Sequence, residues 1–304
     1  MMSATWLKPV LLLIGSGTMG GSSILLAKVG VQEGIPALSY LFWQCLGAGL
    51  ILAILSVGRG GLPPLRAGYI RYYFLAGLVS LAIPMGLGYF MVPYIGASMA
   101  GVFTALPPLM TYLISMGIGI ETAQFKRLMG LMVGFCGVLV LYVPQISAPD
   151  STLLVYLLIA ALIPVSLAVG NVYRTVAWPA GASPLTLASG MMLASAVLCL
   201  VFETGRDQLH VPDFGNGMAW LIIGVQMAVA SLMYICHFEL QRVAGPVFLS
   251  QIGYVMALTS LAGGTLLLGE TLRPELIVTL ACVVAGTFLV RPARTSGGRA
   301  SATS

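Results

Sequence analysis

The sequence predicts an all-α integral membrane protein with ten transmembrane helices. Hydrophobic residues make up 59% of the 304 residues and charged residues only 8%, whereas soluble domains carry about 25% charged residues. Apolar blocks of about 20 residues recur along the chain, and that length is needed to cross a bilayer as a helix. Apolar runs such as 131–141 do not alternate with polar residues as membrane strands would.

The charged residues fall mainly between these blocks, which places the boundaries of ten spans. The predicted spans are 8–28, 37–57, 71–93, 97–117, 127–144, 152–174, 184–203, 217–241, 245–267 and 274–291. All five cysteines lie inside spans without paired spacing, so we interpret them as packing residues and not as disulfides or metal ligands.

The basic residues predict the orientation of the spans. With both termini in the cytoplasm, 11 of the 14 Lys and Arg residues lie on the cytoplasmic side, as the positive-inside rule requires. Only Lys28, Arg206 and Arg273 lie outside. The net charge of +5 therefore reflects membrane topology, and no nucleic-acid partner is predicted.

The first span contains Gly15-Ser16-Gly17-Thr18-Met19-Gly20, which matches the dinucleotide fingerprint G-x-G-x-x-G. A nucleotide site is not expected, because the segment lies in a spanning helix and lacks the required βαβ context. Small residues at Gly17/Gly21 and, in the fifth span, Gly130/Gly134 instead predict close helix packing. The chain has no Walker or His-Glu-x-x-His motif, so no enzyme activity and no cofactor are predicted.

Prolines interrupt the third, fourth and sixth spans at Pro84, Pro107–Pro108 and Pro164. Each removes a helical hydrogen-bond donor, and the freed carbonyls are tolerated only inside protein or beside a water-filled cavity. These prolines favour a central cavity, with simple kinking as the alternative. The seventh span is a continuous apolar run, and the tenth carries a Gly/Ala seam like the fifth.

The eighth span carries a polar stripe. Gln226, Ala230, Tyr234, His237 and Gln241 follow at spacings of 4, 4, 3 and 4, which is one helical face. The stripe predicts a cavity wall, with His237 as a hydrogen-bond donor or a pH-sensitive gate. The alternative is a contact between helices, since such polar contacts average about 0.6 kcal/mol and are common.

Ionisable side chains are nearly absent from the span interiors. No Asp or Glu lies mid-span, Lys28 and Arg174 lie at span ends, and His237 is expected to be the only deep titratable group. The aromatic residues of the cavity would suit an apolar or cationic solute. The predicted cavity residues are Ser23, Trp43, Gln44, Tyr89, Thr104, Pro108, Thr111, Asn171, Gln226, Tyr234, His237, Gln251 and Tyr254.

A weak internal repeat relates the two halves of the chain. An offset of 149 residues aligns 96–137 with 245–286 and pairs Glu121-Thr122 with Glu270-Thr271 and Gly137 with Gly286. Because each copy holds five spans, an odd number, the second copy would be inverted in the membrane. Inverted repeats recur in secondary transporters, with the substrate between the halves.

The segments LPPLMTYLISMGIGIETAQFKRLMGLMVGFCGVLVLYV and LTSLAGGTLLLGETLRPELIVTLACVVAGTFLV resemble the closing half of an EamA-type repeat. This resemblance implies a member of the drug/metabolite transporter superfamily. It implies one repeat over 1–146 (helices 1–5) and an inverted repeat over 147–293 (helices 6–10), followed by a tail, 294–304, that we expect to be disordered and cytoplasmic.

The expected function is secondary transport, and the resemblance implies export of small metabolites. The absence of deep charge favours neutral, zwitterionic or weakly cationic solutes, such as amino acids or lipophilic drugs. A multi-pass protein of the plasma membrane, in particular a bacterial inner membrane, is expected. A nucleotide-sugar or sugar-phosphate carrier and a non-transporting scaffold or sensor remain alternatives. A homodimer through the fifth and tenth spans also remains open.

Overall fold

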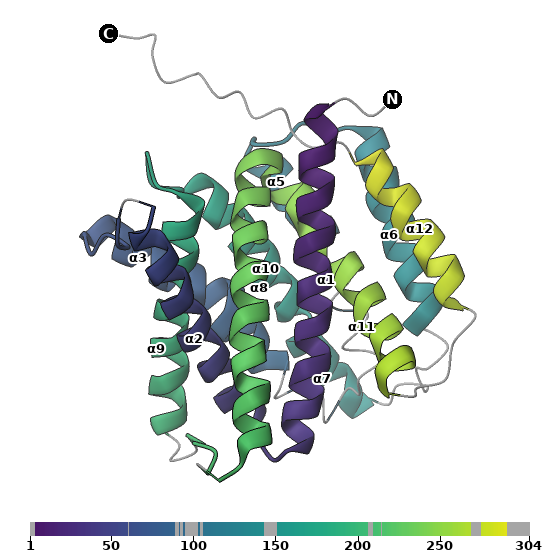
Figure 1. Cartoon of the computed structure of the whole chain (residues 1–304). Coiled ribbons are helices and arrows are strands. Elements are labelled where there is room, and N and C mark those ends of the chain that lie inside the picture. The colour runs from purple at the N-terminus through teal and green to yellow at the C-terminus, as the bar shows by residue number, and fades with distance from the viewer. Residues whose placement is uncertain are drawn as a thin grey trace, which may run out of the picture.

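The computed structural model describes residues 4–59, 61–88, 91, 94, 103, 106–142, 151–205, 209–213, 215–268 and 275–290. Over these residues the regular elements are helices and no strand is present, which confirms the all-α prediction (Figure 1).

The helices follow the predicted apolar segments. The first half contains α1 (Ala4–Gln32), α2 (Ala37–Val57), α3 (Ala67–Gly77), the π-helical turn η1 (Leu78–Ala82), α5 (Pro107–Gly117) and α6 (Phe125–Tyr142). The second half contains α7 (Ser151–Ala160), α8 (Leu162–Val176), α9 (Pro184–Thr204), α10 (Gly217–Ser250), α11 (Ile252–Leu268) and α12 (Glu275–Leu289). The bounds of α2 coincide with the predicted span 37–57.

Six helical segments in the described part of the chain are long and apolar enough to cross a membrane. They are Leu7–Gln32, Ala37–Val57, Ala67–Gly88, Val155–Val176, Pro184–Thr204 and Gly217–Ser250. The apolar helices near the C-terminus, Ile252–Leu267 and Ile277–Leu289, are shorter. The protein is therefore a multi-pass membrane protein by length and composition, while the count of ten spans stays a prediction.

Two of the prolines break their helices one turn upstream, as their chemistry requires. Pro164 cannot donate to the carbonyl of Ala160, and the sixth predicted span divides at that point into α7 and α8. Pro84 lies four residues after Ser80, and the π-helical turn η1 lies immediately before it. The Ser166 hydroxyl donates to the carbonyl of Val79 within η1, at 2.8 Å.

The other two breaks differ from each other. Pro107 and Pro108 are the first residues of α5, where proline costs no hydrogen bond within that helix. Gly245 has φ 77° and ψ 178°, a conformation that glycine adopts readily, and Pro246 follows it. This bend separates the predicted eighth span from the ninth, as expected.

Glycines allow the closest helix contacts. A Cβ on Gly286 of α12 would lie 2.6 Å from the carbonyl oxygen of Gly130 in α6 and 3.0 Å from the Gly134 nitrogen. Gly17 and Gly21 of α1 pack against Val255 and against Met256 and Thr259 of α11. The prediction that these small residues mediate helix packing is confirmed.

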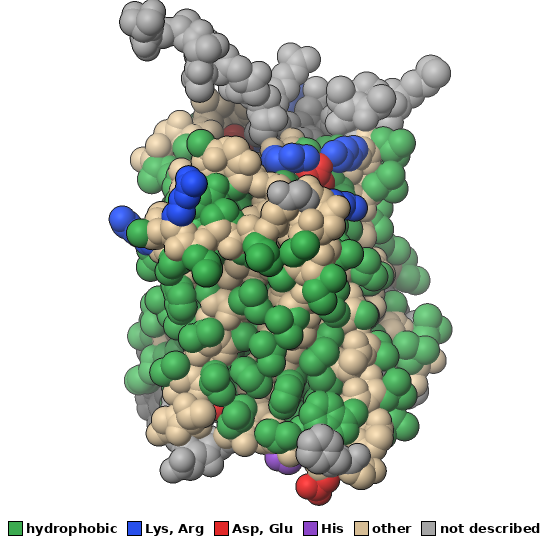
Figure 2. Space-filling model, turned by 60° about the vertical axis from the view of Figure 1, so that its left-hand side comes forward, with side chains coloured by type: hydrophobic (Ala, Val, Ile, Leu, Met, Phe, Trp, Pro, Cys, Tyr) green, Lys and Arg blue, Asp and Glu red, His purple; other side chains and the backbone are tan. Residues whose placement is uncertain are grey.

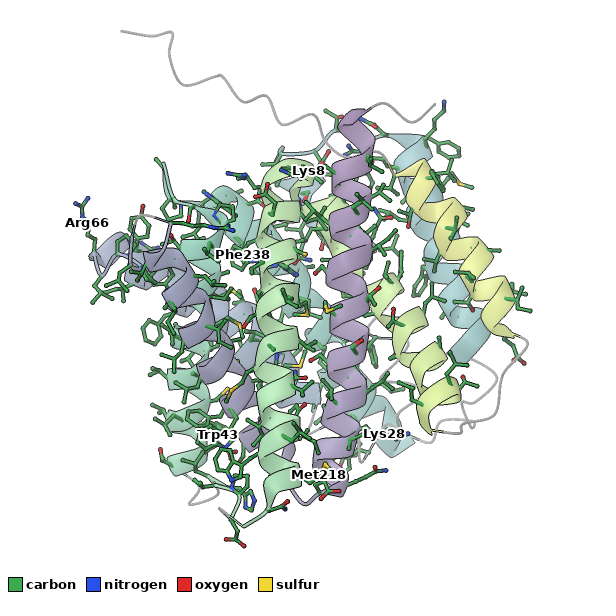
Figure 3. All side chains as sticks on the ribbon, in the orientation of Figure 1. Lys8, Lys28, Trp43, Arg66, Met218 and Phe238 are labelled. Atoms are coloured by element: carbon green, nitrogen blue, oxygen red, sulfur yellow. The ribbon has the colours of Figure 1, made fainter. Side chains whose placement is uncertain are left out.

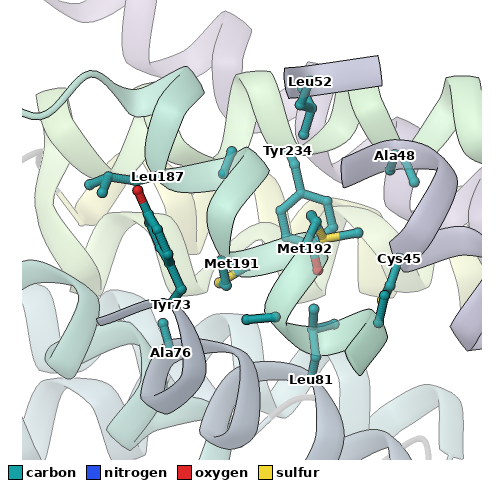
Figure 4. Packing of buried hydrophobic residues seen from close by; sticks show 14 of the residues in the cluster. Cys45, Ala48, Leu52, Tyr73, Ala76, Leu81, Leu187, Met191, Met192 and Tyr234 are labelled. Carbon is teal, nitrogen blue, oxygen red and sulfur yellow. The ribbon is translucent and has the colours of Figure 1, made fainter. Parts of the chain in front are cut away.

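The main hydrophobic cluster joins α2, α3, α9 and α10. Figure 4 shows Tyr73, Met191, Met192 and Tyr234 packed among smaller side chains such as Ala76. This cluster holds together helices from both halves of the sequence and lies beside the polar residues described below.

The surface has an apolar middle and charged ends. Figure 2 shows hydrophobic side chains over most of one face, with Lys and Arg at one end. Large apolar side chains are exposed on the molecule, such as Leu158 at 65% and Leu232 at 55%, as expected where lipid replaces water. Figure 3 places Lys8 and Arg66 toward one end and Lys28 at the other, in agreement with the charge sorting.

Candidate functional site

A buried polar cluster surrounds Arg174, in the last turn of α8. Only 3% of Arg174 is exposed. Its Nε donates to Gln241 Oε1 at 2.9 Å, and its Nη2 donates to Asn171 Oδ1 at 2.7 Å. Its Nη1 donates to Ser80 Oγ, and Nη2 lies 3.1 Å from His237 Nε2. One guanidinium therefore connects α8 with η1 and α10.

Local helix geometry explains why these side chains meet. Asn171 and Arg174 are three residues apart on α8, and His237 and Gln241 are four apart on α10, so each pair shares a helix face. Asn171 Nδ2 also donates to Thr111 Oγ1 of α5 at 3.2 Å. The cluster thus draws on four elements.

Gln241 locks the cluster to the backbone of α8. Its Nε2 donates to the carbonyl of Asn171 at 2.8 Å and to Thr175 Oγ1 at 3.0 Å, while its Oε1 accepts from Arg174. Gln241 and Thr111 are almost fully buried. His237 and Thr175 are partly exposed at the edge of the cluster.

The expectation that His237 is the one deep titratable side chain is wrong. Arg174 lies near a helix end in sequence, but neighbouring helices cover it. Glu203, near the end of α9, is also buried, with 2% exposed, and accepts a hydrogen bond from Ser39 Oγ at 2.5 Å. Burial here follows from helix packing and not from distance to the helix end.

His237 is held neutral by its contact with Arg174. An arginine can only donate, so His237 Nε2 must accept this hydrogen bond and the ring proton must lie on Nδ1. In a protonated imidazole, the Nε2–H would face the N–H groups of Arg174 and not an acceptor. The ring would also place a second positive charge beside the guanidinium. His237 therefore serves better as an acceptor than as a proton carrier.

We expect that His237→Gln leaves any pH-driven uptake into inverted vesicles about unchanged, because the glutamine carbonyl can still accept from Arg174. The measurement is the initial uptake rate with and without an imposed pH gradient, with the wild type as reference. Complete loss of pH dependence in the variant would show that His237 carries the proton.

A second polar group lies further along α10. Gln226 Nε2 donates to Gln44 Oε1 of α2 at 2.7 Å and to Ser23 Oγ of α1. Among the described residues, the Oε1 of Gln226 has no partner, and neither side-chain polar atom of Gln251 has one. Gln251 is fully buried at the α10–α11 break. Buried amides without partners are rare, so these are places where water or solute can bind.

The predicted aromatic residues are not gathered in one wall. Trp43 lies 5.5 Å from the Trp220 ring and donates to the His210 carbonyl, whereas Tyr234 is buried in the main apolar cluster. Tyr254 packs against α6, where its hydroxyl donates to the Leu131 carbonyl at 3.2 Å. Pro108 is buried in the first turn of α5. Tyr89 and Thr104 lie outside the described residues.

A cavity of about 590 Å³ lies away from this cluster, against the helix ends that carry basic residues. It is bounded by the α2–α3 connection, the start of α9 and one face of α10, and includes Arg59 and Arg242. In the described part of the chain, no group of three His, Cys, Asp or Glu side chains could hold a metal ion.

The fold and the apolar surface define a multi-pass α-helical membrane protein with a polar interior. The model of the EamA-like transporter family matches residues 7–143. This segment thus belongs to that family, and the resemblance to the drug/metabolite transporter superfamily identified from the sequence is confirmed.

Solved structures share the fold. Twenty-nine chains match. One of them, titled "Crystal structure of protein", has a TM-score of 0.76 and 18% sequence identity, over 95% of this chain and 98% of its own. At this identity the likeness concerns the fold alone. No curated protein matches the chain.

Sequence reasoning missed Ser80 and the role of Arg174. Ser80 lies four residues before Pro84, so the proline could have marked that turn as irregular and polar. Arg174 shares a helix face with Asn171, a predicted cavity residue, and that spacing was the available signal.

Proposed function

We propose that the protein is a secondary transporter that moves a small solute between two five-helix halves. One observation supports this most strongly: the buried polar cluster combines residues from both predicted repeats. Ser80 and Thr111 come from 1–146, and Asn171, Arg174 and Gln241 come from 147–293. In alternating access the two halves rock against each other, and the solute binds between them. The polar cluster lies at such a contact.

The helix contacts support the inverted repeat. If the two halves are repeats, each predicted span corresponds to the span five positions further along the chain. The contact of α1 with α10 then corresponds to the contact of α3 with α8. In the same way, the contact of α1 with α11 corresponds to the contact of α5 with α8. The contacts of α2 with α9 and of α6 with α12 each join a helix to its own counterpart in the other half. This is the pattern expected if a two-fold axis in the membrane plane relates two five-span units.

The proposed solute is a small metabolite, and the family resemblance favours export across the plasma membrane. The nucleotide-sugar alternative gains no support, because Arg174 is the one cationic side chain in the described cluster and a diphosphate needs more positive charge. The non-transporting scaffold remains the outcome to be excluded by experiment. A homodimer through the outer faces of α6 and α12 stays part of the proposal, since Met132 and Ile277 are exposed there.

Cysteine labelling along α10 tests the proposal. In a variant without the five native cysteines, single cysteines replace Gln226, Ala230, Tyr234 and His237. For a transporter, we expect a membrane-impermeant maleimide to label these positions from one side or the other, with the side changing under an imposed solute gradient. Water must reach each position in at least one state.

The control is Leu232→Cys, at a position on the same helix that is 55% exposed on the apolar outer surface. It should not be labelled from either side, because lipid surrounds it. Uniform protection of all four stripe positions would identify the stripe as a dry contact between helices and would refute transport through it.

A further inference from the structure

Arg174 is a buried cation without a carboxylate partner. Its four hydrogen bonds go to an amide oxygen of Gln241, an amide oxygen of Asn171, the Ser80 hydroxyl and the neutral His237 ring. The Phe238 ring lies 5.9 Å from its Cζ and offers only a weak additional attraction. None of these groups carries a negative charge.

The sequence shows that no carboxylate is within reach on most of the surrounding helices. The chain has no Asp or Glu in 34–120 or in 151–202, and these stretches supply α2, α3, η1, α5, α7 and α8. The acid of α10, Glu239, is paired with Lys8 at 2.6 Å and with Arg242 at 2.8 Å. Glu203, at the far end of α9, is hydrogen-bonded to Ser39.

A charge in this position needs a counter-ion. Buried charges in proteins are paired or bound to ions, because neutral hydrogen-bond partners do not replace the lost hydration. The guanidinium has five N–H groups in a planar fork that matches a carboxylate with two parallel hydrogen bonds. Four hydrogen bonds to described residues are present here, so among these residues one N–H of Nη1 has no acceptor.

We propose that Arg174 binds a carboxylate of the transported solute. This rests on the proposed function and narrows its solute to molecules with a single carboxylate, either zwitterionic or monoanionic. Ser80, Asn171 and Gln241 accept hydrogen bonds from the guanidinium in this arrangement. They give up one or two of these hydrogen bonds when the carboxylate arrives.

The same arrangement selects against other solutes. A quaternary ammonium compound would meet the positive charge of Arg174 with no acid nearby, so the weakly cationic solutes expected from the sequence are disfavoured. A solute with two or more negative charges would find one guanidinium, with His237 kept neutral beside it. The site therefore distinguishes solutes by charge more than by shape.

Ligand-induced stabilisation tests this proposal directly. The purified full-length protein is heated in detergent with matched probes that differ only in the carboxylate. The pairs are acetate and acetamide, L-alanine and L-alaninamide, and L-phenylalanine and L-phenylalaninamide. We expect at least one acid to raise the unfolding temperature at a concentration at least tenfold lower than its amide, because a ligand that binds the folded state stabilises it.

Three variants assign the effect to Arg174. Arg174→Gln should abolish the difference between acid and amide. Arg174→Lys should retain a weaker difference, since it keeps the charge but loses the two-pronged geometry. Arg66→Gln removes an exposed arginine outside the cluster and should behave as the wild type. If Arg174→Gln does not fold, the comparison of Arg174→Lys with Arg66→Gln still shows whether the difference between acid and amide depends on Arg174.

The outcomes separate this proposal from transport itself. If acids and amides stabilise the wild type equally, if no acid does so, or if the Arg174 variants respond as the wild type does, Arg174 is a structural link between helices and the proposal is wrong. Alternating cysteine labelling on α10 would in that case still support transport, of a solute chosen by other residues.

Discussion

Replacing Gly286 with leucine is expected to destabilise the protein by at least about 3 kcal/mol, because inserting side-chain volume into a closely packed contact forces backbone shifts. Even a single Cβ at this position would lie 2.6 Å from the Gly130 oxygen and 3.2 Å from the Gly134 Cα, both backbone atoms. Backbone atoms cannot rotate away as a flexible side chain can. The substitution must therefore separate α6 from α12.

The measurement is the thermal unfolding midpoint in detergent, with Gly224→Leu as the matched control. Gly224 is also a helical glycine, in α10, but no atom lies within 4 Å of its added Cβ. We expect a large decrease in the midpoint for Gly286→Leu and little change for Gly224→Leu. Equal effects in the two variants would mean that helix propensity, and not the α6–α12 contact, controls stability.

The second large effect is expected for Glu121→Gln. Glu121 and Arg127 form an ion pair across the turn between α5 and α6, and both side chains are less than 10% exposed. Removing the Glu121 charge breaks this buried ion pair, and breaking a buried pair by removing one partner costs about 3–5 kcal/mol. We expect the folded state to lose stability by this amount.

The midpoint of chemical unfolding reports the change, and Glu33→Gln provides the comparison. Glu33 is exposed just after α1, so its loss should change the midpoint little. The double variant Glu121→Gln/Arg127→Gln removes both charges and should recover part of the lost stability. If the double variant is no more stable than Glu121→Gln alone, the loss of the ion pair with Arg127 is not the cause of the destabilisation.

These two residues were visible in the sequence as landmarks without a role. Glu121 pairs with Glu270 and Gly137 with Gly286 in the weak internal repeat. The structure gives Gly286 and Glu121 a role. Gly286 permits contact with the α6 backbone, and Glu121 forms an ion pair with a buried arginine. Glu270 lies outside the described residues.

The helices were predictable because their cause is local. About 20 apolar residues in a row have few options in a bilayer other than a helix, and the predicted bounds of α2 agree with the structure. The breaks at Pro164 and Gly245 are also local, since they follow from a missing donor and a positive φ. The effect of Pro108 was harder to predict, because it depends on where its helix begins, and α5 begins at Pro107.

The polar site was only partly predictable. The periodicity of α10 identified Gln226, His237 and Gln241 as one face, and the structure finds all three hydrogen-bonded to neighbouring helices. Tyr254 shows the limit, because its predicted place beside the polar faces depended on which helix this side chain meets, and it meets α6.

The amino-acid sequence by itself determined the class of protein, the helical segments and the absence of acids around the site, since hydropathy and residue identity act over one turn or one span. Tertiary structure alone decided that Arg174 is buried between η1, α8 and α10. The physical reason is that solvent exposure near a helix end depends on which other helices cover it, and those helices come from parts of the chain more than 60 residues away.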